Sequence, residues 1–215
     1  MALFALDKQV TFPPVHLAEP DGLLAVGGDL STERLLMAYR SGIFPWYEGE
    51  HILWWCPDPR FILFPDELKV SKSMKVLLKR QAFEFTINKA FTEVINSCKT
   101  IPRKEQDGTW ITDDVKKAYN RLHQLGFAHS AEVWQNGLLV GGLYGVRLGR
   151  IFFGESMFSK TSNASKYAFI SYVQHLKTEG VQLVDCQVYT EHLESLGAKM
   201  IPRQIFMQEL ARHTQ

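Results

Sequence analysis

The chain has 215 residues with 24 basic and 23 acidic side chains, so its formal net charge at pH 7 is +1. This length suffices for one large hydrophobic core or for two modest domains. Because the net charge is close to zero, no bulk electrostatic field draws the protein to nucleic acid or to a membrane surface. A partner of either kind must be met by a local patch.

The three cysteines, Cys56, Cys98 and Cys186, show no CxxC spacing. Their number and spacing argue for reduced thiols, and against a disulfide framework or a zinc site. The first residues lack a basic segment followed by a long apolar run, and no apolar stretch is long enough to span a bilayer. We therefore expect a cytoplasmic protein without a membrane partner.

Residues 1–62 predict a small, loop-rich N-terminal domain, because prolines, glycines and tryptophans crowd this part of the chain. Ser31 is placed to cap a helix from Thr32 to Ser41. Three tryptophans then occur within ten residues, at positions 46, 54 and 55. Rings at this density either pack together as a small core or line a surface on which a base or an aromatic ligand stacks.

Residues 63–215 predict a second domain with an antiparallel-rich sheet and an α+β fold. A short strand from Arg60 to Phe64 leads into it. The other predicted strands cover residues 83–87, 128–134, 138–146, 151–153 and 181–187. The predicted helices cover residues 71–80, 91–98, 113–125, 164–177 and 191–196, before a short amphipathic C-terminal helix. Thr112 is placed to cap the third of these helices, after a turn at residues 108–111.

A run of lysines at helical spacing distinguishes the helix predicted at residues 71–80. It consists of Lys69, Lys72, Lys75 and Lys79, with no acidic residue between them. A solvated helix face is the ordinary explanation of a charge run. An unmixed basic stripe on a nearly neutral protein also suits contact with a phosphate backbone.

Glu155 follows the second arm of the hairpin predicted at residues 138–153 and has apolar neighbours. A carboxylate in such surroundings costs free energy unless it is paired or used. It either caps the next helix, pairs with a structural arginine, or serves recognition at a strand end. Asp185 and Gln187 favour the last explanation, because both point to one face of a buried strand. Cys186 should face the opposite side and is a poor candidate nucleophile.

Several other chemistries are disfavoured by missing motifs. The chain has no evident Ser-His-Asp or Cys-His arrangement, and no Walker loop, GxGxxG or EF-hand spacing. The strand and helix order around the hairpin resembles the acyltransferase fold of the GNAT superfamily, so an acetyl-CoA enzyme is an alternative. Binding of CoA pyrophosphate needs a glycine-rich loop at the start of the following helix. The segment from Ser159 to Ser165 has no glycine, so binding of acetyl-CoA is disfavoured. We expect no other cofactor and no metal.

Seven sequence strings occur in order over nearly the whole chain and resemble those of the leucyl/phenylalanyl-tRNA–protein transferase family. They are Gly22-Leu-Leu-Ala-Val-Gly-Gly-Asp-Leu-Ser31, Gly42-Ile-Phe-Pro-Trp46, Trp54-Trp-Cys-Pro-Asp-Pro-Arg60, Gly108-Thr-Trp-Ile111, Gly141-Gly-Leu-Tyr-Gly-Val146, Phe153-Gly-Glu-Ser-Met-Phe-Ser159 and Asp185-Cys-Gln187. The chain departs from the family pattern at Cys56, where Ser is usual, and at Ala131, where a β-branched residue is common. It also departs at residues 69–73, where the family is richer in His and Arg.

The resemblance implies a small N-terminal domain beside a GNAT-like domain that uses no CoA. It implies an enzyme that moves Leu or Phe, and less readily Met, from aminoacyl-tRNA to proteins with N-terminal Lys or Arg, which marks them for N-end rule degradation. By residue matching, the 3′-terminal adenosine of the tRNA would be held by Tyr39, Trp46 and Trp110. The reaction centre would contain Glu155, Asp185 and Gln187.

The residue chemistry suggests roles for these groups. Gln187 would orient the attacking amine through its carbonyl oxygen, with Asp185 fixing that amide. Glu155 and Asp185 would together form an acidic pocket for the cationic side chain of the acceptor. An apolar slot for the donor side chain would be formed by Leu143, Phe152, Met157 and Val184.

The lysine stripe would meet tRNA phosphates without reading sequence. A catalytically silent module that binds tRNA or reads protein N-termini remains an alternative. Near-neutral charge and small size favour a monomer.

Overall fold

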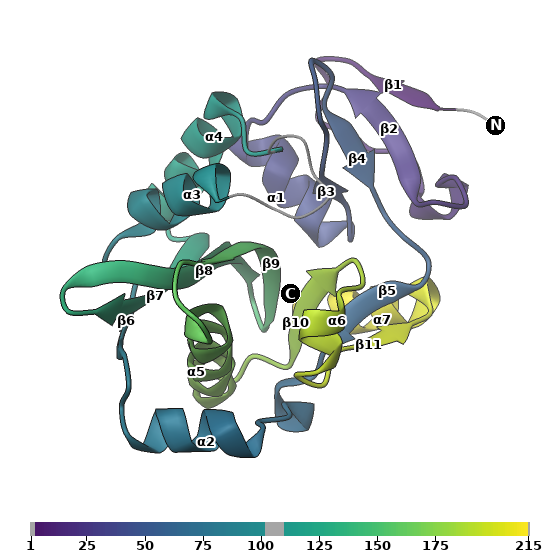
Figure 1. Cartoon of the computed structure of the whole chain (residues 1–215). Helices are drawn as coiled ribbons and strands as arrows, with labels where there is room; N and C mark the ends of the chain where they lie inside the picture. The colour runs from purple at the N-terminus through teal and green to yellow at the C-terminus, as the bar shows by residue number, and fades with distance from the viewer. Residues whose placement is uncertain (1–2, 102–109, 215) are drawn as a thin grey trace.

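The computed structural model describes residues 3–101 and 110–214 (Figure 1). Gly108 and Thr109, part of the turn expected at residues 108–111, lie outside these residues. The described strands form a four-stranded sheet of order β1-β2-β4-β3 and a seven-stranded sheet of order β11-β5-β10-β9-β8-β7-β6. The predicted α+β fold is thus confirmed.

The four-stranded sheet occupies the N-terminal part of the chain. It contains β1 (Phe4–Leu6), β2 (Leu23–Gly27), β3 (Phe44–Pro45) and β4 (Leu53–Trp55), with the short 3₁₀ helix η1 (Val15–Leu17) and α1 (Thr32–Arg40) between strands. The sequence predicts loops here, because strands this short and interrupted by Gly and Pro give no alternating pattern. The helix prediction is confirmed, and Ser31 Oγ accepts a hydrogen bond from the backbone N–H of Arg34.

The seven-stranded sheet is mostly antiparallel, with β9 and β10 as its one parallel pair among the described strands. Its strands are β5 (Arg60–Leu63), β6 (Glu84–Ile87), β7 (Ala128–Gln135), β8 (Leu138–Leu148), β9 (Ile151–Ser159), β10 (Leu183–Gln187) and β11 (Lys199–Ile201). The helices that follow in the same part of the chain are α2 (Lys72–Lys79), α3 (Phe91–Thr100), α4 (Asp113–Gln124), α5 (Ala164–Thr178), α6 (Glu191–Glu194) and α7 (Arg203–His213), with the 3₁₀ helix η2 (Pro65–Glu67) after β5. Thr112 caps α4 as predicted.

Helices cover both faces of this sheet, with α3 and α4 on one side and α5 on the other (Figure 1). Alternating side chains of β8 and β9 therefore enter two different cores. Tyr144 and Phe153 join a buried cluster with α3, α4 and the N-terminal residues Leu35 and Trp54. Leu143 and Phe152 join a second cluster built on α5. The first cluster spans both sheets, so the N-terminal part has no separate core.

The domain boundary expected after residue 62 falls inside β5. This strand pairs over its length with β10 and β11 of the larger sheet. A division placed before Arg60 therefore keeps each sheet whole.

A β-bulge between β8 and β9 determines where Glu155 lies. Tyr144 pairs with Ser156 and Gly145 pairs with Gly154, so Glu155 is the extra residue of β9. Our expectation of a strand-end carboxylate is wrong, because β9 continues to Ser159. Only glycine fits at position 145, since a Cβ there would lie 2.1 Å from the carbonyl oxygen of Phe153.

A second bulge lies in β10 and interrupts the expected alternation of side chains. Asp185 pairs with Ile62 and Gln187 with Phe61, which leaves Cys186 unpaired in the ladder. Gln187 has a left-handed backbone with φ of 64°, a conformation that costs free energy in a residue other than glycine. Backbone strain of this kind is typical of functional sites.

Candidate active site

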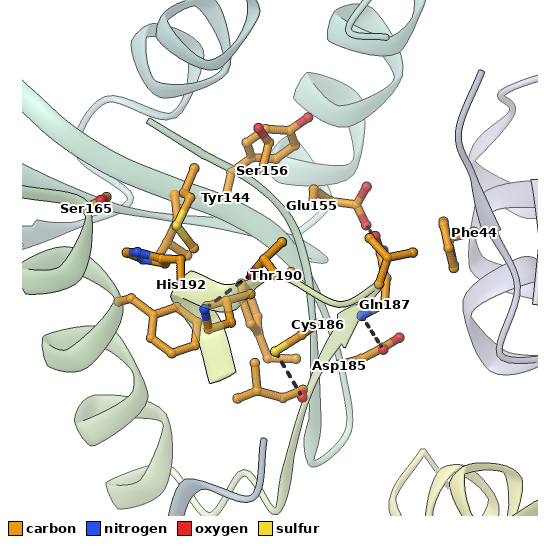
Figure 2. A pocket seen from close by; sticks show the side chains of 18 of the residues that line it. Phe44, Tyr144, Glu155, Ser156, Ser165, Asp185, Cys186, Gln187, Thr190 and His192 are labelled. Carbon is orange, nitrogen blue, oxygen red and sulfur yellow. Dashed lines mark hydrogen bonds between the residues drawn. The ribbon is translucent and has the colours of Figure 1, made fainter. Parts of the chain in front are cut away.

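A cavity of about 450 Å³ lies between β3, Trp110, strands β8 to β10, and helices α5 and α6 (Figure 2). Its lining includes the residues predicted for the reaction centre, Glu155, Asp185 and Gln187, and the four predicted for the donor slot, Leu143, Phe152, Met157 and Val184. Trp46 and Trp110 also line it. The structure thus brings together residues that are up to 141 positions apart in the chain.

Glu155 is half-buried at this cavity and accepts three hydrogen bonds from uncharged groups. Tyr39 Oη donates to Oε1 at 2.7 Å, Tyr119 Oη donates to Oε2 at 2.9 Å, and Gln187 Nε2 donates to Oε1 at 3.2 Å. Burial raises the pKa of Glu155 to about 7, and the hydrogen bonds from the two tyrosines and Gln187 limit the rise. Among the described residues, Glu155 caps no helix and pairs with no arginine, so the structure supports neither of these two alternatives.

Tyr39 and Tyr119 form the floor beneath Glu155. Both are fully buried, and their hydroxyl oxygens lie in direct contact. Burial raises the pKa of both phenols well above the ordinary value, and the nearby Glu155 adds to this, so they remain protonated donors at neutral pH. Tyr39 does not lie on the cavity wall. Its ring packs against Phe153 and its surface is not open to an adenosine in this structure.

Tyr119 was not singled out in the sequence. Its place on α4, four residues after the buried Val115, marked it as part of a core-facing side. A buried tyrosine needs a partner for its hydroxyl group, but the sequence does not reveal that this partner is Glu155.

Asp185 forms a buried ion pair with Arg60. Arg60 Nε donates to Oδ1 at 2.8 Å and Nη2 donates to Oδ2 at 2.6 Å, and both side chains are almost fully buried. The guanidinium group also lies between the rings of Phe44 and Phe206, 4.7 and 4.6 Å from their centroids. Asp185 therefore adds no free negative charge to the cavity, which corrects our expectation of a two-carboxylate acidic pocket.

The side-chain amide of Gln187 is held by Glu155 and not, as we expected, by Asp185. Asp185 Oδ1 instead accepts from the backbone N–H of Gln187 at 3.0 Å. Because Nε2 donates to Glu155, the carbonyl oxygen Oε1 of the same amide is left for a ligand, and no donor among the described residues contacts it. Cys186 lines the same cavity because the bulge interrupts the alternation, and burial raises the pKa of its thiol.

The tryptophans divide between the two roles that the sequence left open. Trp54 is fully buried, and its indole N–H donates to the carbonyl oxygen of Gly27. Trp46 lines the cavity and packs against Trp55 with ring centroids 5.8 Å apart. The side chain of Trp110 is buried at the cavity wall.

The four lysines of the basic stripe are exposed and do not line the cavity. Lys72, Lys75 and Lys79 lie on α2, which packs against α5, and Lys69 precedes the helix. The ion pairs that lysines form within the described residues involve none of the four.

The described residues contain no helix that is long and apolar enough to cross a membrane. No three His, Cys, Asp or Glu side chains in the same part of the chain gather as a metal site.

Comparisons with known proteins agree with the motifs. Residues 62–211 match the family model described as leucyl/phenylalanyl-tRNA protein transferase, and residues 28–58 match the model of its N-terminal domain. The chain is 58% identical over 190 residues to the leucyl/phenylalanyl-tRNA–protein transferase of Syntrophus aciditrophicus, covering 88% of this chain and 80% of that protein. It is 57% identical over 188 residues to the same enzyme of Flavobacterium johnsoniae, covering 87% of this chain and 89% of that protein.

Among solved structures, a GCN5-related N-acetyltransferase from Anabaena variabilis aligns with 83% of this chain and 43% of its own. The TM-score is 0.43 and the identity 10%, so we draw no argument from this likeness.

The sequence matches define an enzyme of the aminoacyltransferase class, and the cavity brings apolar and polar side chains together. Within that class, the chain belongs to the leucyl/phenylalanyl-tRNA–protein transferase family.

Proposed function

We propose that this protein transfers leucine or phenylalanine, and less readily methionine, from aminoacyl-tRNA to the α-amino group of proteins that begin with Lys or Arg. The modified proteins would enter N-end rule degradation, and the enzyme would act as a cytoplasmic monomer. One observation carries the proposal: a single cavity joins an aromatic wall, an apolar slot and an amide with a free carbonyl oxygen.

The lining of the cavity fits the two parts of an aminoacyl-adenosine. Trp46 and Trp110 offer an aromatic wall for the adenine ring. Leu143, Phe152 and Val184 are buried apolar side chains that offer a slot for the amino-acid side chain. An apolar slot of this kind discriminates only modestly among apolar side chains, which fits a donor set of Leu, Phe and Met.

Positioning can supply much of the rate acceleration. The donor is an activated ester, and an α-amino group has a pKa of about 8, so roughly a tenth of it is neutral at pH 7. Gln187 Oε1 can accept a hydrogen bond from that amine. The bonds from Gln187 to Glu155 and from Arg60 to Asp185 hold this amide and its backbone in place.

The choice of a cationic acceptor has support in the charge at the cavity. Asp185 is neutralised by Arg60, whereas no cation pairs with Glu155 among the described residues. The negative charge of ionised Glu155 would therefore favour an N-terminus that carries an additional positive charge.

The exposed lysine stripe supports contact with the tRNA backbone. Four cations without acidic partners are suited to phosphate groups and read no base sequence.

The test is transfer of radiolabelled leucine from Leu-tRNA to a peptide that begins with Arg, with peptides that begin with Lys, citrulline and Ser as a matched series. We expect transfer to Arg and Lys peptides and little transfer to the uncharged citrulline, which matches Arg in shape. Equal transfer to all four peptides would contradict the acceptor proposal. If both substrates bind and the aminoacyl ester bond stays intact, the proposal of a transferase is contradicted.

A further inference from the structure

We propose that Glu155 takes the proton from the attacking amine and returns it to the leaving ribose oxygen, with Tyr39 and Tyr119 as the residues that position its carboxylate. This inference rests on the proposed transferase function. Gln187 orients the amine but cannot hold the proton, because its amide is too weak a base.

The geometry around Glu155 leaves room for an amine. A carboxylate offers about four acceptor positions, and the three donors occupy two on Oε1 and one on Oε2. No described residue donates to the remaining position on Oε2, and Glu155 lies on the cavity wall. The side-chain amide of Gln187 can connect the amine to the carboxylate of Glu155. Its Nε2 donates to Glu155, and no described residue donates to its Oε1, which can accept a hydrogen bond from the amine. The side chains of Gln187 and Glu155 lie side by side at the cavity (Figure 2). An amine bound to Gln187 Oε1 is therefore close to the carboxylate of Glu155.

The bulge explains why this carboxylate reaches the site. As the extra residue of β9, Glu155 has no partner in the β8 ladder, so its side chain is not fixed to the alternation of the strand. It meets Tyr39 from α1 and Tyr119 from α4. Together with Gln187 from β10, residues of three separate elements therefore hold this carboxylate.

Other titratable groups around the site are less suited to hold the proton. Asp185 faces Glu155 from β10 but is paired with Arg60. Tyr39, Tyr119 and Tyr144 approach from α1, α4 and β8, and burial raises the pKa of the first two.

Two further groups line the cavity. Burial raises the pKa of the Cys186 thiol. His192 lies across the cavity from Glu155, and its buried Nε2 has no hydrogen-bond partner among the described residues (Figure 2).

The proton affinities of donor and acceptor are close. The pKa of Glu155 is raised by burial to about 7, and an α-amino group has a pKa of about 8. A general base works best when its pKa lies near the operating pH. A carboxylate at the ordinary value of about 4.3 would be a much weaker base.

Atoms, electron pairs and protons are conserved in the proposed reaction. The nitrogen lone pair of the neutral amine attacks the ester carbonyl carbon, and a C–N bond forms. Glu155 Oε2 takes one proton from that nitrogen. The C–O bond to the terminal ribose oxygen then breaks, and Glu155 returns the proton to this oxygen. The products are an amide and a free ribose hydroxyl, and the carboxylate is restored.

The experiment is the single-turnover rate of leucine transfer to an Arg-started peptide, measured against pH and corrected for hydrolysis of the ester without enzyme. Both the ionised carboxylate and the neutral amine must be present, so the logarithm of the rate should rise with a slope of about two below pH 7 and about one between pH 7 and 8. In Glu155→Gln the slope should be about one throughout this range, and the rate at pH 7.5 should fall about 100-fold.

Tyr119→Phe tests whether Tyr119 positions the carboxylate of Glu155. The measured quantity is the pH dependence of the rate, which a loss of stability alone would not shift. Loss of one donor to the carboxylate should shift the limb assigned to Glu155 to higher pH by about 0.5 to 1 unit. Tyr39→Phe should shift it in the same direction and gives an independent second variant. Tyr167→Phe is the matched control, because Tyr167 is a buried tyrosine that packs against Phe83 on the α2 side of the fold.

A slope of two that persists in Glu155→Gln would overturn the inference while leaving the transferase function intact. The inference would also be overturned if the limb of the pH profile assigned to Glu155 does not shift in either tyrosine variant. If the unaltered protein transfers no amino acid at any pH, the proposed function fails and this inference fails with it.

Discussion

The hydroxyl group of Tyr39 donates a 2.7 Å hydrogen bond to Glu155, although 116 positions separate the two residues. Tyr39 belongs to the helix beside the small N-terminal sheet, and Glu155 belongs to the centre of the large sheet. The site is therefore assembled from both parts of the chain. A division into a small domain and a catalytic domain therefore cuts through the site.

The buried ion pair between Arg60 and Asp185 should be important for stability. Replacing Arg60 by Met leaves Asp185 buried without a cation, and we expect the free energy of unfolding to fall by about 3–5 kcal/mol. Urea denaturation at pH 7 measures this change. Lys199→Met is the control, because it removes an exposed ion pair with Glu67 and should cost at most about 1 kcal/mol. Similar losses in the two variants would contradict the prediction.

The raised pKa of Glu155 predicts how stability depends on pH. The folded protein binds this proton up to about pH 7, whereas the unfolded chain releases it near pH 4.5. Stability is therefore highest below pH 4.5 with respect to this group and falls as pH rises through about 7, by an amount on the order of 3 kcal/mol.

Glu155→Gln should remove this pH dependence. We expect the variant to be more stable than the unaltered protein at pH 8, and to lose that advantage at pH 5. Urea denaturation at the two pH values gives the comparison. A variant that is less stable by the same amount at both values would show that burial of the charge is not the dominant effect.

The lysine stripe should contribute salt-dependent affinity for tRNA. Replacing Lys72, Lys75 and Lys79 by Gln removes three exposed cations, so the slope of log affinity against log salt should become shallower by about 2 to 3. Filter binding of Leu-tRNA between 50 and 200 mM salt measures it. Lys117→Gln, which alters an exposed lysine paired with Asp114, should leave the slope unchanged. An unchanged slope in the triple variant would assign the stripe to solvent alone.

The donor slot should respond to the size of Met157. Met157→Ala enlarges the slot, and we expect the ratio of kcat/KM for Phe-tRNA over Leu-tRNA to rise by about 10-fold. Competition between the two charged tRNAs gives the ratio directly. Met200→Ala is the control, since Met200 is 43% exposed and does not line the cavity. A lower ratio in Met157→Ala would place the donor side chain elsewhere.

The elements of the large sheet follow from sequence where local signals are strong. The strands predicted at residues 128–134 and 138–146 form as β7 and β8, and the caps at Ser31 and Thr112 form at the predicted positions. Local hydrogen bonds and periodicity determine these features, so a single stretch of sequence carries the information.

The partners of the site residues could not be predicted in the same way. The bond between Asp185 and Arg60 joins residues 125 positions apart, and that between Tyr119 and Glu155 joins residues 36 positions apart. Neither spacing has a periodicity to reveal it. The two bulges shift residues out of alternation, which is why the expected contact of Asp185 with the Gln187 side chain is replaced by one from Glu155.

The single hydrophobic cluster that joins the two sheets has a consequence for how such proteins can be recombined. A chain that starts at residue 62 would retain the apolar slot, yet it would lose Tyr39, Arg60 and the apolar cover from Leu35 and Trp54. The two segments should melt in one cooperative transition. Exchange of N-terminal segments between relatives should then alter the acidity of Glu155, because the exchanged segment contains Tyr39.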